Sequence, residues 1–138
     1  MMAKLFLIFA VVSIGCGNDP TGPSNEVTEW RKTLGEGWGN SVQQTIDGGF
    51  IVAGEYFDGS FRTFLLKTDS LGNEQWRKKF GEGWSRSVQQ TVDDGFVVTG
   101  HSRDGSVSLL KTDGQGNEQW RKTFGVGRSY SVQQTVDG

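Results

Sequence analysis

The chain has 138 residues, a length that suits one domain, with 21 glycines, two prolines and a formal net charge of −2. The high glycine content without a Gly-X-Y period excludes collagen, and together with 12% aromatic residues it favours tight turns between short strands. One cysteine and one histidine exclude an intrachain disulfide and a Cys/His zinc site within one chain, and the balanced charge makes nucleic acid a poor partner.

The first sixteen residues, MMAKLFLIFAVVSIGC, have the pattern of an export signal. Lys4 gives a short positive region, and residues 5–14 are nearly all apolar but too few to span a bilayer. Gly15-Cys16 resembles the lipobox of bacterial lipoproteins, in which signal peptidase cuts before a cysteine that carries diacylglycerol. Ser13 departs from the Leu or Val that is usual at its position in the lipobox.

We therefore expect residues 1–15 to be a signal peptide and Cys16 to carry a lipid. This lipid would hold an exported protein on a membrane, facing the periplasm or the cell surface. The alternative is an ordinary signal peptide followed by a free thiol. Residues 16–26 contain both prolines and no large apolar residue, so we expect a flexible tether between the anchor and the rest of the chain.

The remainder of the chain, 27–138, repeats itself with a period of about 45 residues. The tryptophans Trp30, Trp76 and Trp120 mark this period, which lies in the range typical of repeat architectures. Two long segments recur nearly unchanged: SVQQTIDGGFIVAG (41–54) as SVQQTVDDGFVVTG (87–100), and LLKTDSLGNEQWRKKFGEGW (65–84) as LLKTDGQGNEQWRKTFGVGR (109–128).

Each period contains four strand-like segments, which in the first copy are about 41–46, 49–55, 62–69 and 73–80. Asp47-Gly48-Gly49 is a strong hairpin signal between the first two segments. The second and third segments contain continuous apolar runs, which suit strands buried on both faces. The fourth alternates tryptophan and phenylalanine with lysine and arginine, which is typical of an exposed edge strand.

These features predict an all-β fold of four-stranded antiparallel blades of the propeller type, with a stacked β-solenoid as the alternative. Two blades would be complete, at about 41–80 and 87–124. A leading outer strand would lie at 27–34 and a trailing inner strand at 131–136.

The string SVQQTxDGGFxVxG…LLKTDxxGNEQWRKTFG resembles bacterial β-propeller repeats found in many exported and surface proteins. The resemblance covers about residues 27–138 and implies a rigid ring whose loops converge on one face, but no particular ligand. Closed propellers usually need four to eight blades. We therefore expect a truncated product or a fragment of a longer protein, with self-assembly of several copies into one ring as the alternative.

Residues that recur in each copy are expected to stabilise the fold of the blade, and residues that differ between copies are the better candidates for function. Asp47, Asp93 and Asp137 recur, and turn formation explains them better than calcium binding. The recurring pairs Gln43-Gln44, Gln89-Gln90 and Gln133-Gln134 are expected to bond to neighbouring blades, with the lining of a central channel as the alternative.

Two tryptophans, Trp38 and Trp84, lie in glycine-rich loops between blades, where the third copy has Arg128. They are expected either to stack on a ligand such as a sugar ring or to cover the seam between blades. Five other residues break the repeat: Glu55, Tyr56, Arg62, His101 and Arg103. From these two groups the sequence predicts ligand contacts at Trp38, Trp84, Tyr56, His101 and Arg103.

Acid–base chemistry at His101 would need a pocket and converging partners, which the sequence does not indicate. We therefore expect no catalytic residues, no metal and no cofactor. The predicted function is a non-catalytic extracytoplasmic binding or scaffold module on a lipid anchor, with a protein or glycan ligand of unknown identity. The alternative is a piece of a larger propeller enzyme such as a hydrolase, a lyase or a quinone-dependent dehydrogenase.

Overall fold

The structure is a computed structural model that describes residues 31–136. The expected signal peptide, Cys16, the tether, Trp30 and Asp137 lie outside the described residues. No helix in the described part of the chain is long and apolar enough to cross a membrane. The described strands are β1 (Trp38–Gln44), β2 (Phe50–Phe57), β3 (Phe61–Thr68), β4 (Glu74–Glu82), β5 (Trp84–Gln90), β6 (Phe96–His101), β7 (Ser106–Thr112) and β8 (Glu118–Val126).

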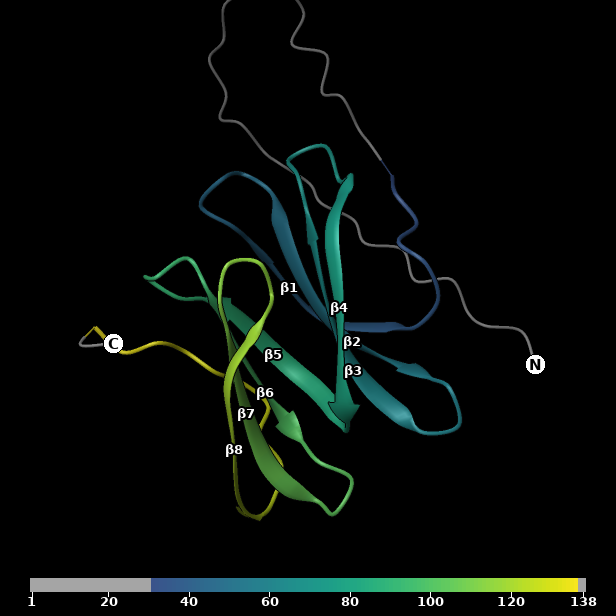
Figure 1. Cartoon of the computed structure of the whole chain (residues 1–138), viewed down its shortest axis with the longest axis vertical. Coiled ribbons are helices and arrows are strands. Elements are labelled where there is room, and N and C mark those ends of the chain that lie inside the picture. Colours follow the sequence, from purple (N-terminus) through teal and green to yellow (C-terminus); the bar gives the residue numbers. More distant parts are fainter. Residues whose placement is uncertain (1–30, 137–138) are drawn as a thin grey trace, which may run out of the picture.

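The strands form two antiparallel four-stranded sheets in chain order, β1-β2-β3-β4 and β5-β6-β7-β8. The sheets lie side by side, and β5 packs next to β1 and β2 of the first sheet (Figure 1). Each sheet is a meander that ends in a charged outer strand, which is the architecture of a propeller-type blade. The all-β prediction is therefore confirmed, and the strands extend a few residues beyond the predicted bounds of 41–80 and 87–124.

Short turns fix the register of each sheet. In the β1–β2 hairpin, Thr45 N–H donates to Gly49 O and Gly48 N–H donates to Thr45 O, both at 2.9 Å. Gly48 has a φ of 81°, and Asp94 occupies the same place in the second sheet with a φ of 63°. Aspartate tolerates this left-handed conformation better than most residues, so the second copy can replace glycine without losing the turn.

The main core lies between the two sheets. Ile51, Ala53 and Leu65 of the first sheet pack against Phe96 and Leu110 of the second, and all five side chains are buried. Trp76 and Phe80 of β4 cover the edge of this core, with the rings of Trp76 and Phe96 5.8 Å apart. A seam between sheets therefore supplies the burial that neither sheet achieves alone.

The segments before and after the two sheets repeat the contacts of the blades without being strands. Lys32 Nζ donates to Asn73 at 3.0 Å, as Lys78 of β4 donates to Asn117 at 3.2 Å. Residues 31–34 thus lie where the outer strand of a preceding sheet would lie. They are not strand, unlike the expectation for 27–34, because no described strand pairs with them.

The trailing segment behaves in the same way. Val132 N–H donates to Ser87 Oγ at 3.3 Å, as Val88 N–H donates to Ser41 Oγ at 3.1 Å. Residues 131–136 occupy the place of a third inner strand, but they too lack a backbone partner and differ from the expected strand. A strand needs a ladder of backbone hydrogen bonds, and side-chain contacts to a neighbouring sheet do not replace it.

Candidate functional site

The two sheets differ most at the end where β2 turns into β3. Gly54 pairs with Phe64 in the first sheet, and Gly100 pairs with Ser108 at the same place in the second. Nine residues (55–63) lie between the first pair and seven (101–107) between the second, so the first hairpin is two residues longer. The extra length adds a Phe57–Phe61 pair at the tip of the hairpin.

Phe61 joins the two tryptophans that the sequence singled out. Its ring lies 5.7 Å from Trp38 and 5.5 Å from Trp84, and Phe57 packs edge-on against it at 5.2 Å. The imidazole of His101 also stacks on Trp84, at 4.8 Å and with an interplanar angle of 12°. We call these five residues, Trp38, Phe57, Phe61, Trp84 and His101, the aromatic surface.

The two tryptophans are not equivalent. Trp84 contacts Phe61 of the first sheet and His101 of the second, so it covers the seam between the sheets, which was one of the two expectations for it. Trp38 contacts a single described aromatic ring, that of Phe61, and remains 38% exposed. Phe57 is 60% exposed at the hairpin tip. The open part of the aromatic surface is therefore formed by Trp38 and Phe57.

Glu55 occupies the place in the first sheet that His101 occupies in the second. Trp38 pairs with Glu55 across β1 and β2, and Trp84 pairs with His101 across β5 and β6. Glu55 is buried, and desolvation raises the pKa of its carboxyl, opposed by the hydrogen bond from Asn40 Nδ2 at 2.5 Å. The same amide donates to Ser85 O at 2.8 Å, so Asn40 ties Glu55 to the second sheet.

His101 has an electrostatic environment of its own. Burial lowers the pKa of its imidazole, and the positive charges of Arg86 and Arg128 lower it further. Its buried Nδ1 has no hydrogen-bond partner among the described residues. The imidazole is therefore held neutral, in a form suited to stacking on the Trp84 indole.

The structure thus brings three of the five predicted ligand contacts together and separates the other two. Tyr56 points to the opposite face of β2, where it packs beside Val52 and Lys79 Nζ lies 4.4 Å from its ring centre. Arg103 is exposed and forms an ion pair with Glu82 at 3.0 Å. Sequence reasoning missed Phe57 and Phe61, although the two-residue insertion in the repeat was a signal that pointed to them.

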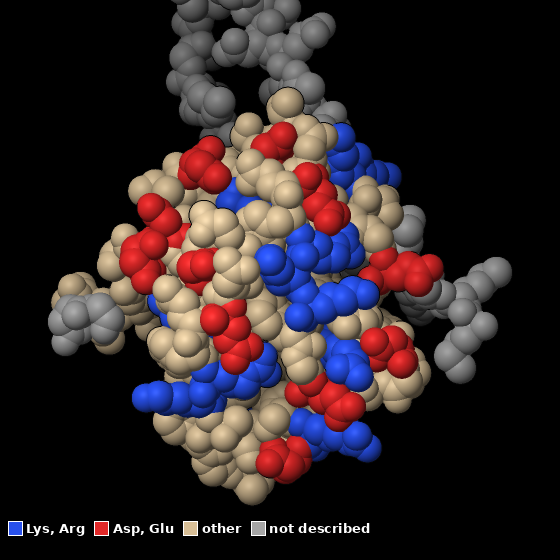
Figure 2. Space-filling view, in the orientation of Figure 1, with Lys and Arg blue, Asp and Glu red and all other residues tan. Residues whose placement is uncertain are grey.

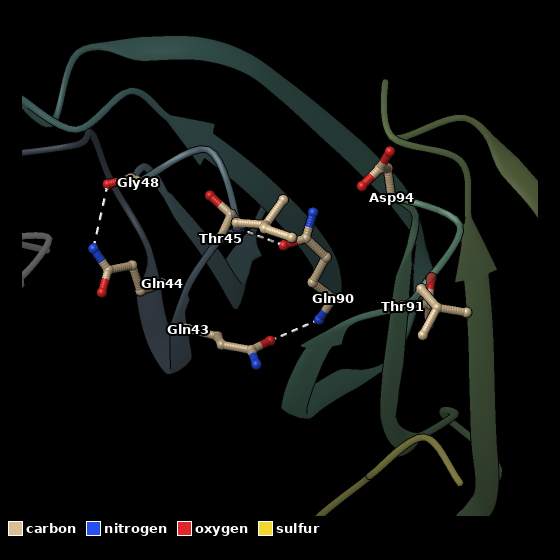
Figure 3. Close-up of a pocket in the computed structure, with 9 residues that line it drawn as sticks. Gln43, Gln44, Thr45, Gly48, Gln90, Thr91 and Asp94 are labelled. Carbon is tan, nitrogen blue, oxygen red and sulfur yellow. Dashed lines mark hydrogen bonds between the residues drawn. The ribbon is translucent and has the colours of Figure 1, made fainter. Parts of the chain in front are cut away.

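The glutamine pairs lie at the opposite end of the sheets and join them. Gln43 Oε1 accepts from Gln90 N–H at 2.6 Å, while Gln90 Oε1 accepts from Ile46 N–H at 2.8 Å (Figure 3). Gln134 repeats the second contact with Val92 N–H at 2.9 Å. The expectation that these amides bond to neighbouring blades is met by Gln43, Gln89, Gln90 and Gln134, whereas Gln44 bonds to Gly48 O of its own hairpin.

An open groove of about 560 Å³ lies between the two turns at this end (Figure 3). Ile46 and Val92 line it, and both are 87% exposed. The Asp94 carboxylate stands at the turn that borders the groove, on the second sheet. Gln43 and Gln90 of the groove lining join the two sheets, so these two amides have a structural role.

The recurring aspartates Asp47 and Asp93 are explained by the turns. Asp47 accepts from Lys67 Nζ, Thr45 Oγ1 and Gly49 N–H, and Asp93 accepts from the corresponding groups in the second sheet. These hydrogen bonds lower the pKa of each carboxyl to about 2. Within residues 31–136, no group of three or more His, Cys, Asp or Glu side chains could hold a metal ion.

The charges near the aromatic surface include two ion pairs, together with Arg86 and Arg128, whose positive charges act on His101. Arg62 pairs with Asp58 at 2.9 Å beside the hairpin tip, and Arg103 of the second sheet pairs with Glu82 of β4 in the first sheet. Acidic and basic side chains are interspersed over the face of the molecule seen in Figure 2. The aromatic surface can therefore stack on a flat group, and polar side chains lie at its border.

No family model matches the chain, and no curated protein matches its sequence.

Proposed function

We propose that the chain is a non-catalytic binding module displayed outside the cytoplasm, and that the aromatic surface is its binding face. The observation that supports this most directly is Phe61, which a two-residue insertion in one hairpin places between Trp38 and Trp84. The insertion departs from the repeat where the exposed rings of Trp38 and Phe57 both pack on Phe61. Exposed apolar patches with polar borders are typical of interaction sites.

The chemistry of this surface favours binding over catalysis. His101 is neutral and stacked, its Nδ1 lacks a described partner, and the Glu55 carboxylate is held by Asn40. A general base needs an accessible atom within hydrogen-bond reach of a substrate, together with a partner that orients it. The rings and amides of this surface can give contact area and specificity without such a step.

The proposal includes a lipid anchor at Cys16, which follows from the lipobox-like sequence before it. Replacing Cys16→Ser is expected to move the protein from the membrane fraction to a soluble exported form. An unchanged membrane fraction would contradict the anchor and leave the binding module unaffected.

The binding function is tested with the full chain carrying Cys16→Ser, so that a lipid does not retain it on membranes. Its sedimentation with isolated cell envelopes of the source organism is compared with that of the same chain carrying Phe57→Ser. Loss of binding in the Phe57→Ser chain is expected, because half of the open aromatic surface is removed. Val126→Ser is the matched control, since Val126 is 89% exposed on β8. Absence of wild-type binding, or equal binding by both variants, would overturn the proposal.

A further inference from the structure

The molecule has two seams that carry different charges at equivalent positions of the repeat. The first lies between the two sheets, and the second lies between the second sheet and the segment that follows β8. At four positions the second seam has lost a negative charge or gained a positive one. The pairs of residues, first seam and then second, are Asn40 and Arg86, Glu55 and His101, Glu82 and Val126, and Trp84 and Arg128.

Arg128 is held beside His101 by the residue that follows it. Ser129 Oγ donates to Gly100 O at 2.7 Å, and Gly100 directly precedes His101. The positive charge of Arg128 acts on the imidazole, while its side chain is exposed to solvent. One guanidinium group therefore reaches the end of the second seam from the segment after β8.

Arg86 reaches the same place from β5. It occupies the β-bulge of that strand, and Asn40 occupies the equivalent bulge of β1. The amide of Asn40 crosses the first seam to Ser85 O at 2.8 Å, so a side chain at this bulge can face the next unit. The charge of Arg86 acts on His101 and also on Glu55. Positive charges from two elements therefore converge on His101.

Neither guanidinium group has an acidic partner at ion-pair distance within residues 31–136. Glu55 attracts Arg86, but its carboxylate is buried and accepts from Asn40. The neutral imidazole of His101 brings no negative charge. Neighbouring charged groups are already engaged: Arg62 with Asp58, Arg103 with Glu82, and Asp104 with Ser102 Oγ and Ser106 N–H.

Resting on the proposed binding function, we propose that Arg86 and Arg128 bind a phosphate group of the ligand, at the border of the aromatic surface beside Trp84 and His101. A guanidinium group presents its N–H donors as a fork that matches phosphate oxygens. A phosphate has enough oxygens to accept from two such forks, and a monoester carries close to two negative charges at neutral pH. A carboxylate has two oxygens and one charge, and it compensates only one of the two arginines.

His101 reports on this site because it is the single histidine of the chain. Its imidazole proton resonance, followed by NMR against pH, gives its pKa without ambiguity. In the full chain with Cys16→Ser, inorganic phosphate should raise the pKa of His101 above its value in sodium chloride of equal ionic strength. The reason is that bound phosphate compensates the two charges that lower this pKa. An unchanged pKa would overturn the site.

The double variant Arg86→Gln/Arg128→Gln removes both charges. The pKa of His101 should rise in sodium chloride alone, and phosphate should raise it no further. Arg103→Gln is the matched control, because Arg103 is exposed at the same end of the sheets but pairs with Glu82, and it should keep the response to phosphate. Circular dichroism and thermal unfolding show that each variant is folded. A response to phosphate that survives in the double variant would overturn the assignment.

Envelope binding connects the site to the proposed function. Binding should fall at least about tenfold in Arg86→Gln/Arg128→Gln and should stay in Arg103→Gln, because the double variant loses charge-assisted hydrogen bonds to the ligand. Full binding by the double variant would overturn the phosphate contact and leave the binding function standing. Absence of wild-type binding would overturn the binding function, whereas the response of His101 would still show whether the site takes phosphate.

Treatment of the envelopes identifies what carries the phosphate. Cold hydrofluoric acid, which cleaves phosphate esters, is expected to abolish binding, and unimpaired binding after this treatment would overturn a phosphate ligand. Extraction with chloroform and methanol separates the two sources that agree with the proposal. Loss of binding after extraction would assign the phosphate to a lipid headgroup, and retention would assign it to an envelope polymer.

Discussion

The ammonium group of Lys67 donates to both carboxylate oxygens of Asp47, at 3.0 and 2.8 Å, from a position that is almost closed to solvent. The side chain of Asp47 is 53% exposed, whereas that of Lys67 is 6% exposed. Lys67 also donates to Thr68 O and Gln75 Oε1, so all three of its protons have acceptors. The same arrangement recurs between Lys111 and Asp93.

This asymmetry in burial predicts unequal effects of removing either partner. Asp47→Ala leaves the buried Lys67 ammonium without its carboxylate and should lower the free energy of unfolding by about 2 to 3 kcal/mol. Lys67→Met leaves Asp47 at the surface, where water can solvate it, and should cost about 1 kcal/mol. Urea unfolding of the two variants measures the difference. Equal costs would show that the pair is less buried than described.

The free energy of unfolding should also fall at low pH, because two carboxyl groups have lowered pKa values in the folded chain. The pKa values of Asp47 and Asp93 fall from 3.8 to about 2 on folding, so the unfolded chain binds protons more readily than the folded chain. Their contribution is fully present above about pH 4 and is lost as the pH falls through about 2. Chemical unfolding at pH values between 2 and 6 should show this decline. In Lys67→Met/Lys111→Met the decline should be smaller, because one of the main causes of the lowered pKa values is removed.

Two tryptophans at the same place in the repeat should lower the free energy of unfolding by different amounts when each is replaced by alanine. Trp76 packs against Phe96 between the sheets, and Trp76→Ala should cost about 3 kcal/mol of unfolding free energy. Trp120 is 42% exposed on β8, and Trp120→Ala should cost less than about 1 kcal/mol. Thermal and urea unfolding compare the two. Similar costs would mean that an unseen contact covers Trp120.

The two glutamines of one pair, Gln43 and Gln44, should also contribute unequally to the free energy of unfolding. Gln43 accepts from Gln90 N–H across the seam at 2.6 Å, and Gln43→Ala should cost about 1 to 2 kcal/mol because that N–H loses its partner. Gln44 makes only a long 3.5 Å contact with Gly48 O in its own hairpin, so Gln44→Ala should cost at most about 0.5 kcal/mol. Hydrogen exchange of the Gln90 amide, faster in Gln43→Ala alone, would confirm the assignment of the bond.

The sequence was most informative where one local rule decides the structure. The Asp-Gly-Gly turn, the apolar runs around Ile51 and Leu65 and the charged β4 were all predicted from composition and spacing, and the structure confirms them. The seam contacts of the glutamine pairs could also be predicted, because an amide that recurs on an inner strand must satisfy its hydrogen bonds.

The aromatic surface could be predicted only in part, because it depends on contacts across the seam. Trp38 and Trp84 stood out as tryptophans in glycine-rich loops, and His101 as a break in the repeat. No spacing rule, however, brings Phe61 between residues 23 positions before and after it. Tyr56 lies apart from the other rings because adjacent residues of a strand point to opposite faces, and the sequence alone did not show which face borders the seam. The burial of Lys67 had no sequence signal beyond its recurrence as Lys111.

The seam has a consequence for how such a chain can change in evolution. Ser41 and Gln43 accept from the backbone of β5, and Ser87 and Gln89 accept from residues 132 and 134 in the same way. Each of the two sheets therefore has one face whose side chains accept hydrogen bonds from the next sheet or segment, and the second sheet has another face that donates such bonds to the sheet before it. Duplication of the DNA that encodes one repeat adds a sheet that already fits both of its neighbours. The number of repeats can therefore change without disturbing the seams, while the tip of each β2–β3-type hairpin changes independently.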